Sequence, residues 1–217
     1  AGDWMVVEAD ESDGTFVRLP AAIAVVTNMD PEHLDFYGDF DTERKAFESF
    51  VENVPFYGAA IMCIDHPEVQ SMVGRISDRR IVTYGESPQA GIRAVNVTYS
   101  TGGSNFDVIS TDRATGDVET ISGLRLPMPG IHNVLNSLVT FAVAREMGID
   151  SETVRKALAG FEGVKRRFTR TGEAGGITVI DDYAHHPTEL DALYQGVNEM
   201  YPDDQKVIVF QPHLFSR

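Results

Sequence analysis

The sequence predicts an α/β fold: a mostly parallel sheet flanked by helices, with a small antiparallel sheet, then the start of a second, Rossmann-like α/β domain. Between residues 23 and 85, short apolar runs alternate with helical segments, a rhythm typical of βαβ units. Between 92 and 126, short segments of alternating polarity are separated by turns rich in Gly, Ser, Asn and Asp, which predicts antiparallel hairpins. A further apolar run, 177–180, opens the second domain.

Composition and periodicity predict the individual elements. The predicted strands are short apolar runs bounded by polar residues: 4–7, 23–26, 59–64, 80–85, 177–180 and 206–210. The predicted helices carry apolar residues three and four positions apart: 40–53, 66–73, 131–146, 152–161 and 189–200. Ser151 is the expected N-cap of the helix 152–161, and the glycine-rich stretch 171–176 is expected to be flexible.

Charge and cysteine content narrow the function. The chain has 217 residues and a formal net charge of -15, from 33 acidic and 18 basic side chains. Nucleic acids and anionic membranes bind clustered Lys and Arg. The acidic excess of this chain therefore argues against both as partners. No segment has the pattern of a transmembrane span or a signal peptide. The single cysteine, Cys63, excludes an internal disulfide; its apolar flanks indicate a buried, inert thiol, and this fits a reducing, cytoplasmic setting.

Two predicted strands end in acidic loops. The run 4–7 is followed by four acids within the six residues from Glu8 to Asp13, and the run 23–26 leads into a loop with three carboxylates and His33. Such a loop is either a solvated turn with a helix cap or a site for a hard cation, because Mg²⁺ prefers oxygen ligands. Parallel strands end at one sheet edge, so two such loops favour the cation site.

Polar residues at the start of the helix 131–146 point to a second ligand. Asn133 and Asn136 are three positions apart and share one face of this helix. Asparagine is a poor helix former, and capping explains one of the two but not both. The pair therefore fits hydrogen bonds to a ligand with donors and acceptors, such as a purine.

The one dense basic cluster, 165–167, lies at the predicted domain boundary. Three consecutive cations form either a solvated face or a phosphate contact in an interdomain cleft. We expect the first domain to span 1–163 and the second 164–217. Both ends of the chain lie beside strand-like runs, so we expect a fragment of a longer protein.

These motifs together resemble the Mur ligases of bacterial cell-wall synthesis. Six stretches match in family order and cover essentially the whole chain: 8–13, 27–28 with 33–35, 130–136, 163–168, 181–187 and 211–217. The resemblance implies an ATP-dependent amide-bond ligase that phosphorylates a carboxylate with ATP and lets an amine attack the acyl phosphate. Within the family, the match implies small-molecule substrates: ATP, L-alanine and UDP-N-acetylmuramate.

The resemblance also implies roles for individual residues. Glu8 and His33 would be ligands of Mg²⁺, or Mn²⁺, at the ATP phosphates. The bound cation would reverse the local negative charge, so that an anionic nucleotide can bind to this acidic chain. The implied nucleotide contacts are His132, Asn133 and Asn136 at adenine, Arg167 at the phosphates and Asp182 at the ribose. The implied substrate contacts are Tyr183, His185, His186 and His213. Catalytic roles would fall to Arg167, His185, His186 and Arg217.

Two of the chain's departures from the family pattern bear most on the expected activity. Phe47 stands where several Mur ligases carry a carbamylated lysine, so no such lysine is expected. No G-x-x-x-x-G-K-[ST] phosphate loop occurs in the sequence, and in the family this loop lies upstream of the position of Glu8. We therefore expect residues 1–217 alone to show no turnover, and ATP-dependent ligation by them would contradict this.

Three other functions stay open. The first is a ligase that attaches a tripeptide to the same class of muramyl acceptor. The second is a metal-dependent hydrolase built from the carboxylates, His33 and the pair His185-His186, although no H-x-H or H-E-x-x-H spacing occurs. The third is a non-catalytic nucleotide-binding module, which would not need both Glu8 and His33.

Overall fold

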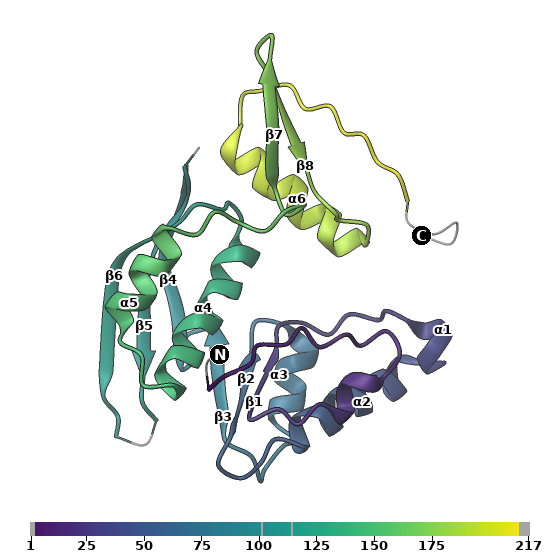
Figure 1. Cartoon of the computed structure of the whole chain (residues 1–217), viewed down its shortest axis with the longest axis vertical. Coiled ribbons are helices and arrows are strands. Elements are labelled where there is room, and N and C mark those ends of the chain that lie inside the picture. The colour runs from purple at the N-terminus through teal and green to yellow at the C-terminus, as the bar shows by residue number, and fades with distance from the viewer. Residues whose placement is uncertain (1–2, 101, 114, 213–217) are drawn as a thin grey trace. The chain divides into compact units, whose positions relative to one another are not determined.

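The computed structural model describes residues 3–100, 102–113 and 115–212, and the chain divides into two compact units, Ala1–Gly91 and Ile92–Arg217 (Figure 1). Each unit is described by itself. Among the described residues, no helix combines the length and the apolar content that crossing a membrane requires.

The first unit is built on three parallel strands in the order β1 (Ile23–Val26), β2 (Ala59–Cys63) and β3 (Ile81–Gly85). Ile23 is in register with Ala59, and Ala60 with Ile81. β2 lies between the other two strands, and every one of its residues is buried. The parallel arrangement predicted from the βαβ rhythm is confirmed.

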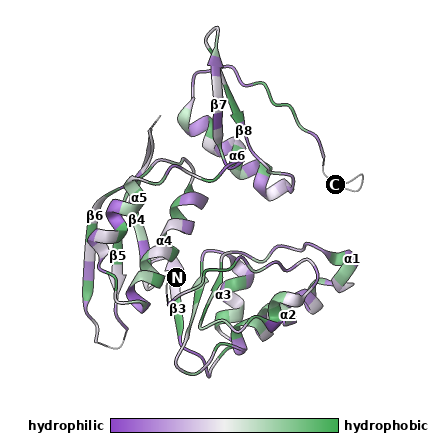
Figure 2. Ribbon diagram, viewed as in Figure 1, coloured by the Kyte–Doolittle hydropathy of each residue, from purple (hydrophilic) through white to green (hydrophobic). Residues whose placement is uncertain are grey.

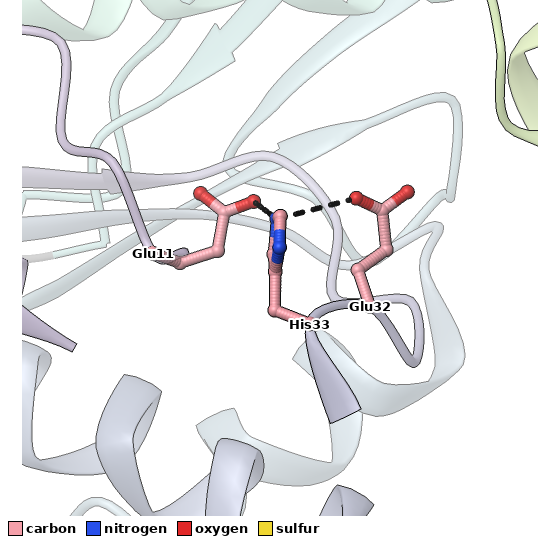
Figure 3. A group of neighbouring side chains, drawn as sticks. All are labelled: Glu11, Glu32 and His33. Atoms are coloured by element: carbon pink, nitrogen blue, oxygen red, sulfur yellow. Dashed lines mark ion pairs between the residues drawn. The ribbon is translucent and has the colours of Figure 1, made fainter. Parts of the chain in front are cut away.

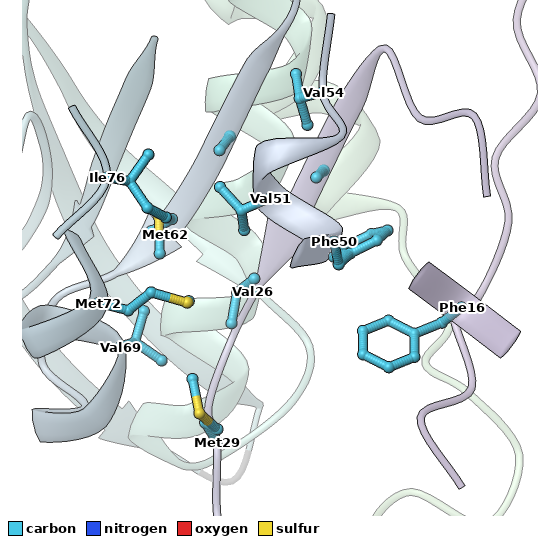
Figure 4. Close-up of a cluster of buried hydrophobic side chains, with 12 residues drawn as sticks. Phe16, Val26, Met29, Phe50, Val51, Val54, Met62, Val69, Met72 and Ile76 are labelled. Carbon is cyan, nitrogen blue, oxygen red and sulfur yellow. The ribbon is translucent and has the colours of Figure 1, made fainter. Parts of the chain in front are cut away.

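Helices supply the rest of the first unit: the 3-10 turn η1 (Thr15–Arg18), α1 (Leu34–Tyr37), α2 (Phe40–Glu52) and α3 (Pro67–Val73). Figure 4 shows their apolar side chains meeting those of the strands, among them Phe16, Phe50 and Met72. The ring of Phe16 lies 5.2 Å from that of Phe47 and 5.3 Å from that of Phe50. Phe47 is thus packed against the core.

The second unit begins with an antiparallel meander, β4 (Ile92–Ser100), β5 (Gly103–Thr111) and β6 (Val118–Leu126). Helix α4 (Ile131–Glu146) packs against β4, and α5 (Ser151–Ala159) against β6. The N-cap of α5 is Asp150, whose carboxylate accepts from the Thr153 amide at 2.9 Å, so the expected cap at Ser151 is wrong. The Ser151 hydroxyl instead donates to Glu119.

The last part of the second unit holds a two-stranded antiparallel sheet, β7 (Thr169–Ala174) and β8 (Ile177–Asp181), followed by α6 (Pro187–Met200). The expectation of a flexible stretch at 171–176 is therefore wrong. Most of it is strand β7, and its glycine pair forms the hairpin turn that lets the backbone pair with β8.

Two predicted strands, 4–7 and 206–210, are absent. Val6 is 97% exposed and Val209 is 94% exposed, although both lie in segments of hydrophobic side chains (Figure 2). A strand is defined by its ladder of backbone hydrogen bonds, and no described strand pairs with either segment. Apolar composition predicted the strands correctly only where a partner strand lies alongside.

One carboxylate is buried in the first unit. The side chain of Glu43, on α2, is only 1% exposed and accepts a hydrogen bond from the Glu32 amide at 3.3 Å. Burial raises the pKa of Glu43 to about 7; nearby Glu11, Glu32 and Asp30 add to the shift, while the Glu32 amide opposes it. Ionising Glu43 at neutral pH therefore costs stability.

Gly58 is predicted to tolerate no side chain. A Cβ there would lie 2.2 Å from the backbone oxygen of Ala22, which also accepts the Ala59 amide beside β1 and β2. Gly58→Ala should lower the free energy of unfolding by about 1–3 kcal/mol, because this backbone must shift. Gly74→Ala is the matched control, since its Cβ would meet only the Ser71 oxygen at 3.5 Å. Equal unfolding midpoints in denaturant for the two variants would contradict the prediction.

Glu43→Gln should change how stability depends on pH. The folded state holds the Glu43 proton up to about pH 7, whereas the unfolded chain releases it near 4.5. Stability therefore falls as pH rises through this window, by up to about 3 kcal/mol from this group. Glutamine keeps the hydrogen-bond acceptor and removes the ionisation. The stability of the variant relative to the wild type should therefore increase as pH rises. Urea unfolding at several pH values measures this, with exposed Glu52→Gln as the control.

Candidate functional site

In the first unit, His33 lies between two carboxylates, those of Glu11 and Glu32 (Figure 3). Its Nε2 is 3.6 Å from the Glu11 carboxylate and 3.7 Å from that of Glu32. One ligand atom from each of the three residues lies within 4.8 Å of the others. The His33 side chain is 30% exposed, so a small ion can reach the group from solvent.

Side chains of the helices α1 and α2 hold the loops that carry this group. His33 has a left-handed backbone, with φ of 52°, at the start of α1. Glu43 accepts from the Glu32 amide, and the Tyr37 hydroxyl donates to the backbone oxygen of Glu11 at 2.5 Å. The loop after β1 and the loop around Glu11 are thus tied to α1 and α2, which brings the three side chains together.

The donor set fits a divalent cation. Two carboxylates and one imidazole suit Mg²⁺ or Mn²⁺, although histidine is an uncommon ligand for Mg²⁺. Of the predicted pair, only His33 belongs to this group; Glu8 is exposed and lies outside it. Both acids of this group lie in the acid-rich loops noted in the sequence, but sequence reasoning singled out neither Glu11 nor Glu32 as a ligand.

In the second unit, His132 lies at the first turn of α4. It is preceded by Gly130, where a Cβ would lie 2.6 Å from the His132 ring, so the absent side chain makes room for the imidazole. Burial lowers the pKa of His132; Asp182 opposes and Arg167 reinforces this effect, which places both charged groups near the ring. The charges of Arg167 and Asp182 thus both act on His132, and all three residues were predicted separately as nucleotide contacts.

The two asparagines of α4 differ. The Asn133 side-chain amide donates to the Pro129 backbone oxygen at 2.7 Å and contacts His132 Nε2 at 3.0 Å. Asn133 therefore does not cap α4, because its side chain donates to a backbone oxygen and the N-cap position, Gly130, has no side-chain cap hydrogen bond. Asn136 is exposed, one turn further along the helix.

The basic cluster is built into the fold. Arg166 and Phe168 have left-handed backbones, with φ of 62° and 49°. The Asp182 carboxylate accepts from the amides of Phe168 at 2.7 Å and Ala184 at 2.8 Å. The Arg166 guanidinium lies 4.4 Å from the centre of the Tyr183 ring. The turn that carries Arg167 is thus fixed to the loop after β8 by one Asp182 oxygen, while the other oxygen orders that loop itself.

His185 and His186 lie at the start of α6. The His186 side chain caps this helix, accepting from the Thr188 amide at 3.4 Å, and Glu189 accepts from the amides of both histidines. The Glu189 carboxylate lies 3.6 Å from the Arg167 guanidinium. Sequence reasoning missed Glu189, although its position three residues after a polar N-cap is a capping-box signal. The predicted residues His213 and Arg217 lie outside the described residues.

Comparison with known proteins agrees with these observations. The family model of the Mur ligase middle domain matches residues 2–144, and that of the Mur ligase glutamate ligase domain matches 166–214. A UDP-N-acetylmuramate–L-alanine ligase from Rhodospirillum rubrum is 61% identical over 100% of this chain and 45% of its own length. The chain therefore spans less than half the length of that relative.

Two solved structures show the same fold. The UDP-N-acetylmuramate–alanine ligase from Thermotoga maritima is 29% identical, with a TM-score of 0.75 over 94% of this chain and 44% of its own. The murein peptide ligase from Psychrobacter arcticus is 25% identical, with a TM-score of 0.61 over 86% of this chain and 37% of its own. Because the middle-domain model alone covers well over half of the residues, the chain belongs to the Mur ligase family.

Proposed function

We propose that the protein containing this chain is an ATP-dependent ligase that joins L-alanine to UDP-N-acetylmuramate in peptidoglycan precursor synthesis. The observation that carries the proposal is the 61% identity over the whole chain to a ligase of that name. The reaction requires an acyl phosphate, so negative charge must be neutralised where ATP and the carboxylate meet. The two groups of side chains described above supply charge and ligands of the right kind.

The group around His33 would hold Mg²⁺ or Mn²⁺. Glu11 and Glu32 would be its carboxylate ligands, with Glu8 as the alternative carboxylate that the family resemblance implies. Bound there, the cation would neutralise charge on the phosphates of ATP. The chain's own contribution is to keep His33 and the carboxylates close together before the ion binds, through Glu43 and Tyr37.

In the second unit, the residues around His132 would receive the nucleotide. His132 and Asn136 would contact adenine; Asn133 would orient His132, to which it is bonded. Arg167 would contact the phosphates. Asp182 is near enough to His132 to affect its pKa, which supports a ribose contact beside its backbone role. Tyr183, His185, His186, His213 and Arg217 would contact the muramyl substrate or L-alanine, as the resemblance implies.

We place the boundary between the central and C-terminal domains near residue 164. The limits of the two family models, 144 and 166, support this position. The single cysteine, buried in β2, supports a reducing, cytoplasmic location.

One further function has an observation in its favour. The similarity to a murein peptide ligase is compatible with a peptide as the incoming amine, although its identity is lower, at 25%. A metal-dependent hydrolase and a non-catalytic nucleotide-binding module are tested by the experiments below.

His33→Ala in the full-length enzyme should lower turnover by roughly a hundredfold and leave ATP affinity much less affected. The reason is that the cation held by His33 would neutralise the phosphate charge during phosphoryl transfer. Steady-state ADP release and ATP binding by calorimetry measure the two effects. His66→Ala, a half-buried histidine without a predicted role, is the control. Unchanged turnover would favour a binding module. Mn²⁺ titration of Glu8→Gln and Glu11→Gln then shows which carboxylate joins His33; the structure favours Glu11.

The full-length enzyme should release ADP when given UDP-N-acetylmuramate and L-alanine, and much less with a tripeptide in place of L-alanine. The reason is the stronger similarity to alanine ligases, at 61% identity. Faster ADP release with the tripeptide would replace the proposed substrate. Stoichiometric Zn²⁺ in metal analysis, with no ATP consumption, would favour a hydrolase.

A further inference from the structure

The Glu189 carboxylate contacts three of the residues assigned to the reaction. It lies in the first turn of α6, and its Oε2 accepts from the amides of His185 at 3.0 Å and His186 at 3.2 Å. Its Oε1 lies 3.6 Å from Nη1 of Arg167. The imidazole of His185 is also 3.6 Å from the carboxylate. One side chain therefore links the basic turn at Arg167 to the histidine pair, two segments some twenty residues apart in the sequence.

The surroundings keep Glu189 charged. Burial would raise its pKa, but the amides of His185 and His186, together with the nearby His185 side chain and the Arg167 guanidinium, lower it below the usual value. The side chain is one-third exposed, and that of Arg167 is 55% exposed. Arg167 is thus held beside an anion but is open to solvent, so a phosphate can compete for it.

We propose that Glu189 is a positioning residue that holds Arg167 and the pair His185-His186 in one arrangement before the substrates bind. This rests on the proposed function, which gives Arg167 and the two histidines their roles. Glu189 itself touches no reacting atom. One of its oxygens fixes the backbone of His185 and His186, and the other orients the Arg167 guanidinium.

The competing explanation is that Glu189 is only a helix cap. A capping box needs an acceptor at this position and no charge, since glutamine serves as well as glutamate. Orientation of Arg167 needs the charge. Glu189→Gln therefore separates the two explanations, because it keeps the acceptor for both amides and removes the ion pair.

The test uses the full-length enzyme and incorporation of radiolabelled L-alanine. Glu189→Gln should leave the melting temperature within about 2 °C and lower kcat/KM for ATP about tenfold, because a misplaced group close to the reaction costs rate rather than stability. In an Arg167→Gln background the same substitution should cost less than about twofold, because the group it orients is already gone.

Glu152→Gln is the matched control. Glu152 also lies in the first turn of a helix and pairs with an arginine, Arg155, at 2.7 Å, but neither residue has a proposed role. It should leave the reaction unchanged. An equal loss from Glu189→Gln in both backgrounds, or a loss that follows a fall in melting temperature, would show a helix cap and overturn the proposal. Wild-type activity with an unaffected Glu189→Gln variant would overturn this proposal alone, whereas an inactive wild type would overturn the proposed function as well.

Discussion

Carboxylates that accept hydrogen bonds from backbone amides hold the loops of this protein. Asp65, after β2, accepts from the amides of Glu86 at 2.6 Å and Ser87 at 3.0 Å, and so joins the ends of two strands. Asp182 and Glu189 do the same for the segments around the basic turn and the histidine pair. A loop cannot satisfy its own amides through a ladder, so it needs side-chain acceptors. Part of the large acidic excess is therefore structural.

The two units treat negative charge differently. In the first, carboxylates gather around His33, and Glu43 behind them is shifted toward its neutral form. Such a group gains most from a divalent cation. In the second, Arg167 already lies beside Glu189, so the positive charge is supplied by the chain itself.

Periodicity and local chemistry made most of the fold predictable. Helices α2 and α4 and the strands β1 and β2 follow from apolar spacing and turn residues, which act over a few positions. The segments 4–7 and 206–210 have the same apolar content, but pairing depends on residues distant in the sequence, so composition could not reveal that they would stay unpaired. The strand β7 was missed because its glycines also fit a linker.

The sequence indicated which loops form the candidate site, but not which of their side chains point toward one another. The acid-rich loops identified the His33 region, yet which acid turns toward the imidazole depends on Tyr37 and Glu43, whose contacts span many residues. Likewise, a histidine pair after a strand indicated chemistry, whereas the contact between Glu189 and Arg167 needs the chain to fold back on itself.

The reactivity of the Cys63 thiol reports on the exposure of strand β2. It is the only cysteine, it lies at the end of the central strand β2, and it is 4% exposed. Burial raises the pKa of its thiol, so the reactive thiolate is suppressed as long as the strand stays in place. The rate at which a thiol reagent labels the protein therefore follows the rate or the population of β2 exposure, site-specifically and without any engineered probe.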